Sequence, residues 1–181
     1  MVATHEVFNQ PEPLTGCNLF SSNQALQAAL KFNAPQLDTA ELAQLGELLG
    51  SDAMQTHARL ANTHTPQLHS HDRFGRRIDQ VEFHPSYHAL MEVATRAGLH
   101  GSPFSADEQA TGHAHTRRAA AFMMFTETEP SVLCPISMTY AVTPALRTNP
   151  AIYADWAPQL TSRAYDPALK LWRNKIGRAH V

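Results

Sequence analysis

The sequence predicts a mainly α-helical domain with one small β-hairpin. Most of the chain carries apolar residues at the three- and four-residue spacing of amphipathic helices, and proline and glycine separate these segments. Only residues 68–83 change to the two-residue alternation of short strands around a turn. With 181 residues, 43% of them hydrophobic, the chain can bury roughly 70% of its unfolded surface in one core. We therefore expect a single helical domain in residues 1–160.

The first 23 residues predict an extended arm. They are polar, contain Pro11 and Pro13, and end in an apolar anchor at residues 17–20. A first helix is expected from Gln24 to Phe32, because Pro35 follows its apolar repeat closely.

Two helices joined by a tight turn are expected next. Asp38 and Glu41 have the spacing of a capping box at the start of the first, which Gly50 ends. Its apolar face is formed by Leu42, Leu45, Leu48 and Leu49. Ser51 or Asp52 can cap the second helix, and the short connection predicts that the two pack antiparallel.

The hairpin and the helix after it are marked by turn residues. Residues 72–75, Asp-Arg-Phe-Gly, are typical of a tight turn in which Gly75 takes a positive φ. His84 and Pro85 then start a helix that ends at Gly98, with Pro85 in its first turn.

A long helix is predicted to end at about Thr128. Ser105 and Glu108 have capping-box spacing at its start, although Gly112 weakens the first turns. We expect its buried side to consist of Ala119, Phe122, Met123 and Phe125.

The segment from Leu133 to Leu146 predicts the next helix, entered near Pro135 and ended or kinked by Pro144. One narrow stripe of small and soft side chains runs along it: Cys134, Met138, Ala141, Val142 and Ala145. Periodicity alone favours an ordinary buried helix, but such a stripe also lets another backbone or a flat ligand approach closely. A brief helix at 152–156 and a connector at 161–175 complete the chain.

Composition excludes several classes of protein. The net charge is −2, only 17% of residues are charged, and the dispersed Arg and Lys residues give no basic field for nucleic acid. Cys17 and Cys134 lie in no metal or redox spacing, so we expect reduced thiols, with Cys134 buried and inert. Neither a signal sequence nor a membrane span is evident, which predicts a soluble cytoplasmic protein.

The eleven histidines suggest metal binding, but weakly. His84 and His88 have the i, i+4 separation that places two imidazoles on one helix face, and His69-x-His71 and His113-x-His115 could add ligands. His84 precedes a proline and is expected at the helix cap, so structural roles are favoured and no metal site is assigned. Because nucleophile and nucleotide-binding motifs are absent too, we assign no catalytic and no cofactor-binding residue.

Three ordered segments resemble the AidB-type flavoproteins, the alkylation-response branch of the acyl-CoA dehydrogenase superfamily. They are LCPISMTYAVTPAL at 133–146, FNQPEPL at 8–14 followed by Asn-Leu-Phe at 18–20, and GRRIDQVEFHPSYHALM at 75–91. The resemblance runs from about Val7 to about Lys175. It implies the N-terminal helical domain of the acyl-CoA dehydrogenase fold, truncated before the middle β domain.

The resemblance also implies a reaction in which a carboxylate removes the α-proton of an acyl thioester while the β-hydrogen leaves as hydride to FAD. The helix at 133–146 would line the acyl side of that site, with Met138, Thr139 and Val142 as substrate-lining residues. Flavin loop, catalytic carboxylate and the C-terminal region that binds double-stranded DNA in this family would lie in regions missing here. The complete protein would be a homo-oligomer, a tetramer.

Residues 161–175 are accordingly expected to lead into the missing middle β domain. The last six residues, IGRAHV at 176–181, match what one frame of a common sequencing adaptor encodes, and we expect them to be read-through.

The sequence therefore predicts the N-terminal fragment of an FAD-dependent, AidB-type acyl-CoA dehydrogenase, inactive alone. The alternative is a free-standing helical oligomerisation or interaction module without catalysis. A polar outer face on the helix at 133–146 would favour the module, whereas a large exposed apolar face would favour the fragment.

Overall fold

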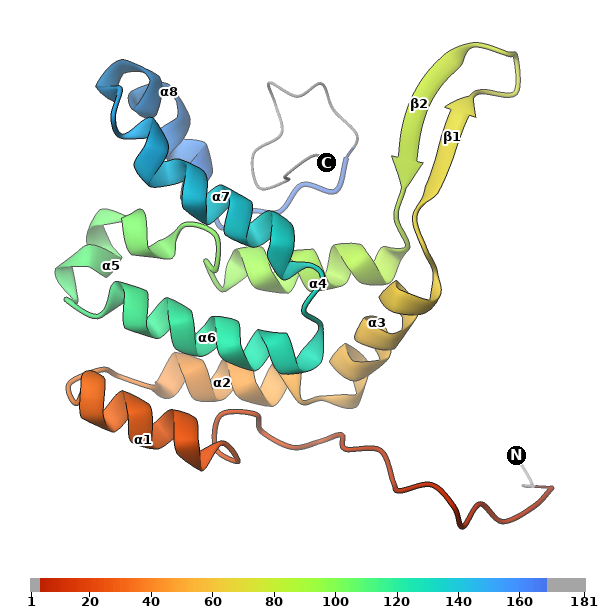
Figure 1. Ribbon diagram of the computed structural model, residues 1–181, viewed down its shortest axis with the longest axis horizontal. Coiled ribbons are helices and arrows are strands. Elements are labelled where there is room, and N and C mark those ends of the chain that lie inside the picture. Colours follow the sequence, from red (N-terminus) through yellow and green to blue (C-terminus); the bar gives the residue numbers. More distant parts are fainter. Residues whose placement is uncertain (1–3, 169–181) are drawn as a thin grey trace.

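The computed structural model describes residues 4–168 and confirms the mainly helical fold with one hairpin (Figure 1). Its helices are α1 (Gln24–Asn33), α2 (Ala40–Leu49), α3 (Asp52–Thr63), α4 (Pro85–Arg96), α5 (Ala106–Ala110), α6 (Ala114–Thr128), α7 (Leu133–Leu146) and α8 (Pro150–Leu160). Strands β1 (Gln67–His71) and β2 (Arg77–Glu82) form the hairpin, and a 3₁₀ turn, η1, spans Ser102–Phe104. Helix α6 packs against α2 and α7, so it occupies the centre of the bundle.

The N-terminal arm is extended and anchored as predicted. Leu19 and Phe20 are buried in the core, whereas Phe8 and Leu14 are exposed. The anchor lies directly on α2, where Leu19 N donates to the carbonyl of Gly46 at 3.0 Å. A Cβ at Gly46 would come within 2.6 Å of Phe20 N, so the glycine permits this close crossing.

Helix α2 forms without the predicted capping box. Asp38 Oδ1 accepts from Ala40 N at 2.9 Å, but the side chain of the N-cap residue, Thr39, makes no capping hydrogen bond. Glu41 does not return to the helix start, because its carboxylate accepts instead from Arg117 on α6 at 2.9 Å. The predicted reciprocal pair is therefore wrong, and a tertiary ion pair replaces it.

Helix α3 is capped by Ser51, as expected, but does not run antiparallel to α2. Ser51 Oγ accepts from Met54 N at 3.3 Å. Figure 1 shows α3 turning away from α2 toward α4, and α3 makes its most extensive contacts with α4. The antiparallel prediction is wrong because α2 packs on α6 instead, which leaves α3 to cover the start of α4.

The hairpin projects from the bundle into solvent (Figure 1). Leu68 pairs with Val81 in an antiparallel register, and every residue of both strands is exposed. Gly75 has φ +79°, which confirms its role in the turn, and Asp72 Oδ1 accepts from Phe74 N at 2.8 Å.

Helix α4 begins as predicted, and the following helix is divided. His84 is the N-cap, its Nδ1 accepting from Ser86 N at 3.1 Å, with Pro85 in the first turn. The expected long helix is wrong in its first part: Gly112 has φ +72° and separates α5 from α6. The Ser105 side chain does not cap α5, because its hydroxyl donates back to the carbonyl of Ser102.

The buried side of α6 is only partly as predicted. Phe125 is buried, but Ala119 and Met123 are exposed and Phe122 is half-buried. The buried residues of α6 are Ala114, Ala120, Ala121, Met124, Phe125 and Thr128. Helix α6 contacts α2 on one side and α7 on another. The set of buried side chains therefore differs from the single apolar face that the sequence repeat predicts.

The chain ends in a longer helix and a connector. Asn149 caps helix α8, its Oδ1 accepting from Ile152 N, and the helix extends beyond the predicted 152–156 to Leu160. The connector then returns across the bundle, where the Ser162 carbonyl accepts from His100 Nε2 at 2.8 Å. The rest of the predicted connector, residues 169–175, and the expected read-through at 176–181 lie outside the described residues.

Candidate functional site

Helix α7 presents an apolar outer face. Leu133, Ile136, Thr139 and Thr143 are buried where α7 packs against α8, α4 and α6. The predicted stripe lies on the opposite side: Cys134, Met138, Ala141, Val142 and Ala145 are all exposed. The expectation that Cys134 is buried is therefore wrong, because the neighbouring helices cover the other side of α7.

The three candidate substrate-lining residues separate between the two faces. Met138 and Val142 lie one turn apart on the outer face, with 49% and 39% of their surface exposed. Thr139 is buried, and its Oγ1 donates to the Pro135 carbonyl at 3.2 Å. The outer face can therefore offer Met138 and Val142 to an apolar ligand, whereas Thr139 is satisfied within the helix.

Pro144 does not end α7 at once. The helix continues to Leu146, where Arg147 N donates to the carbonyl of Thr143 at 3.2 Å. Pro144 lies in the last turn, so its missing N–H removes one helical hydrogen bond and little of the helix follows it. The exposed face thus keeps helical spacing from Cys134 to Ala145.

An aromatic and cationic cluster holds α7 against α6. The Arg118 guanidinium lies 4.1 Å from the ring centre of Tyr140 and 4.4 Å from that of Phe122, and Arg118 Nε donates to the Leu99 carbonyl at 2.9 Å. Burial lowers the pKa of Arg118 from its ordinary value, while nearby Tyr140 opposes the shift. The i, i+4 spacing of Arg118 and Phe122 was available in the sequence, but Tyr140 joins them only through the fold.

The histidine pairs do not converge on a metal. His84 stacks on His64 with ring centres 4.6 Å apart, while His88 Nδ1 lies 2.7 Å from the Tyr165 hydroxyl. His69 contacts Glu82, and His115 contacts Tyr140. Within residues 4–168 no three His, Cys, Asp or Glu side chains gather as potential metal ligands.

His100 is a buried histidine that the sequence did not single out. It is 1% exposed, and its Nε2 donates to the Ser162 carbonyl, which fixes the connector against the end of α4. Burial lowers its pKa, the Ser162 hydrogen bond opposes this shift, and the charge of Arg163 adds to it. His100 is therefore a neutral structural anchor near pH 7.

Comparison with known proteins finds relatives that match most of the bundle. The family described as adaptive response protein AidB N-terminal domain matches residues 9–167. A curated relative, the putative acyl-CoA dehydrogenase AidB of Escherichia coli K12, is 41% identical over 167 residues, which are 92% of this chain and 30% of the relative. The chain thus spans about a third of that relative's length.

Solved structures agree on the fold. Caenorhabditis elegans ACDH-11 in complex with C11-CoA superposes with a TM-score of 0.74 at 20% identity, over 90% of this chain and 28% of that one. The apo form of Bd2924 gives the same TM-score at 27% identity, over 87% and 32%.

No helix in residues 4–168 has the length and apolarity to cross a bilayer. The family match covers most of the described bundle, and it includes α7 and both strands of the hairpin. The chain belongs to the family of AidB N-terminal domains and has the helical fold found in acyl-CoA dehydrogenases.

Proposed function

We propose that this chain is the N-terminal part of an FAD-dependent, AidB-type acyl-CoA dehydrogenase and is inactive alone. The family match and the 41% identity to the Escherichia coli relative support this proposal. The observation that carries it is the exposed apolar face of α7, on which Met138 and Val142 lie without a cover from residues 4–168. A face of this kind normally packs against another element or a ligand.

In the complete protein, this face forms the acyl wall of the substrate site. Met138 and Val142 contact the aliphatic part of an acyl thioester and exclude water from it, while Thr139 supports the helix from its buried side. FAD, when bound in the complete protein, would supply the acceptor for the β-hydrogen. The outer face of α7 offers only apolar and small side chains, so it suits an acyl chain, whereas the flavin and the carboxylate base belong to segments beyond this chain.

The same proposal extends to the partners of the whole protein. In this proposal, the whole protein acts in the cytoplasm in the response to DNA alkylation and assembles as a homotetramer. It binds double-stranded DNA through a region outside this chain. Resemblance to the AidB family supports these properties. The net charge of −2 gives this part of the protein no basic field of its own for DNA.

The alternative is a free-standing helical module, for which α7 should have a polar outer face. That face instead carries Cys134, Met138, Ala141, Val142 and Ala145. The apolar composition favours the fragment of a larger enzyme.

A chimera tests the proposal. Residues 9–167 of this chain replace the matching segment of the Escherichia coli relative, and both the chimera and the isolated 181-residue chain are titrated with FAD and acyl-CoA. We expect the chimera to hold one FAD and to change its flavin absorbance on addition of acyl-CoA, and the isolated chain to bind neither. A folded chimera whose flavin does not respond, where that of the unmodified relative does, would contradict the proposal.

A further inference from the structure

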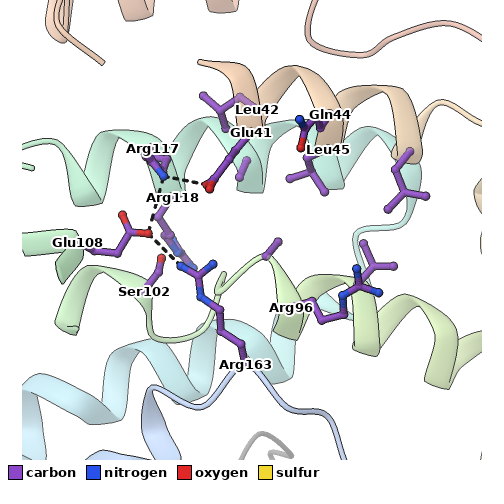
Figure 2. Close-up of a pocket in the computed structure, with 14 residues that line it drawn as sticks. Glu41, Leu42, Gln44, Leu45, Arg96, Ser102, Glu108, Arg117, Arg118 and Arg163 are labelled. Atoms are coloured by element: carbon purple, nitrogen blue, oxygen red, sulfur yellow. Dashed lines mark hydrogen bonds and ion pairs between the residues drawn. The ribbon is translucent and has the colours of Figure 1, made fainter. Parts of the chain in front are cut away.

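A cavity lies on the bundle away from the outer face of α7. It has a volume of about 380 Å³ and is lined by α2, the end of α4, η1, α5 and α6, with the connector along one edge (Figure 2). Its lining residues are Glu41, Leu42, Gln44, Leu45, Leu48, Val93, Arg96, Ala97, Ser102, Glu108, Arg117, Arg118, Ala121 and Arg163. None of them belongs to α7, so the acyl wall proposed above and this cavity are separate.

The cavity wall carries more positive than negative charge. Arg117 pairs with Glu41 at 2.9 Å, and Arg163 pairs with Glu108 at 2.9 Å (Figure 2). Arg96 and Arg118 also line the cavity, and neither forms an ion pair with any described residue. Four guanidinium groups and two carboxylates thus line the cavity. Arg96 lies apart from the other three arginines, so the end formed by Arg117, Arg118 and Arg163 with Glu41 and Glu108 carries a net charge of about +1 for an anion to meet.

The arginines in this wall also have buried N–H donors for which the described residues provide no acceptor. Arg117 Nε and Arg118 Nη2 are buried without a hydrogen-bond acceptor among the described residues, and one acceptor, Glu108 Oε2, is buried there without a donor. Arg118 is held in place by the Leu99 carbonyl and by the rings of Phe122 and Tyr140. Guanidinium groups that are fixed in advance and lack acceptors are suited to a carboxylate or phosphate, since they lose little freedom on binding.

The other half of the cavity is mainly apolar, with Gln44 and Arg96 at its edge. Leu45 and Leu48 of α2 face Val93 and Ala97 of α4, and Leu48 is 43% exposed. In Figure 2 Glu108, Arg117, Arg118 and Arg163 gather at one end, while Leu45, Gln44 and Arg96 lie toward the other. A volume of this size is within the range of small-molecule sites.

We propose that this cavity binds a small amphipathic anion, with a carboxylate at the arginine end and a short aliphatic chain between α2 and α4. A ligand that fits this lining must match both the excess of guanidinium groups and the apolar wall. Inorganic phosphate satisfies only the first, and an uncharged apolar ligand only the second. The proposal does not depend on the flavin enzyme.

Calorimetric titration of the full 181-residue chain with octanoate tests this assignment. We expect saturable one-to-one binding, with acetate and inorganic phosphate at least tenfold weaker because they lack the aliphatic chain. Arg163→Gln should weaken octanoate binding about tenfold, as expected for the loss of one charge-assisted hydrogen bond. Leu48→Ser should weaken octanoate and leave acetate unchanged.

The matched control is Arg59→Gln, which removes the same charge from an exposed position on α3 outside the cavity. It should bind octanoate like the unmodified chain. Absence of saturable binding up to about 10 mM, a range that excludes even weak specific sites, would overturn the proposal. Equal weakening by Arg59→Gln and Arg163→Gln, or phosphate binding as tight as that of octanoate, would overturn it as well.

Discussion

Replacing Phe125 with alanine is expected to lower the free energy of unfolding by about 3–5 kcal/mol, the usual cost of removing a buried aromatic ring. Phe125 is fully buried on the central helix α6 and packs in the same core as Leu49, Leu90 and Met124. Because α6 contacts α1, α2, α3 and α7, a cavity at this position weakens most of the bundle. Urea denaturation followed by helical circular dichroism measures the change.

Phe32 supplies the matched control for this substitution. It lies on α1 with 86% of its surface exposed, so Phe32→Ala removes the same ring from water and should change stability by less than about 0.5 kcal/mol. Similar losses for the two variants would mean that α6 is not the centre of the core.

The second large effect concerns the outer face of α7. In the chimera with the Escherichia coli relative, Val142→Asp should weaken acyl-CoA binding by about 100-fold or more, because an acyl chain packed on this face would bury an unpaired carboxylate. Val142 is 39% exposed in this chain, so the same substitution should leave the isolated domain folded. Flavin absorbance during an acyl-CoA titration reports the dissociation constant.

Ile152→Asp separates a local effect from a general one. Ile152 is an apolar residue on α8 with 44% exposure, and its substitution adds the same negative charge elsewhere on the surface. Repulsion of the CoA phosphates alone would weaken binding alike in both variants. The proposal instead expects a change of less than about twofold for Ile152→Asp, within the range of neutral surface substitutions.

Much of the fold follows from residues with local effects. Gly75 supports the hairpin turn, His84 and Pro85 start α4, and Ser51 caps α3, because each acts through its own backbone neighbourhood. The errors concern partners that are distant in sequence. The capping-box spacing predicts that Glu41 contacts the start of its own helix. Its carboxylate instead lies 2.9 Å from Arg117, which is 76 positions further along the chain.

The orientation of amphipathic faces was harder to predict. An apolar stripe on α7 was evident from spacing, but spacing does not say which side neighbouring helices cover. Thr139 and Thr143 could be buried because their hydroxyl groups donate to carbonyls one turn earlier, which leaves Met138 and Val142 outside. The sequence does not predict the arginine-lined cavity either, since its walls come from α2, α4, η1, α5, α6 and the connector.

Photochemical cross-linking tests most directly whether the outer face of α7 forms an acyl wall. An acyl-CoA with a diazirine on its aliphatic chain is irradiated with the chimera, and the modified residues are mapped by mass spectrometry. The proposal predicts labelling at Met138 and Val142, reduced by an excess of unmodified acyl-CoA. Labelling that is competed away by acyl-CoA but lies entirely outside α7 would contradict it.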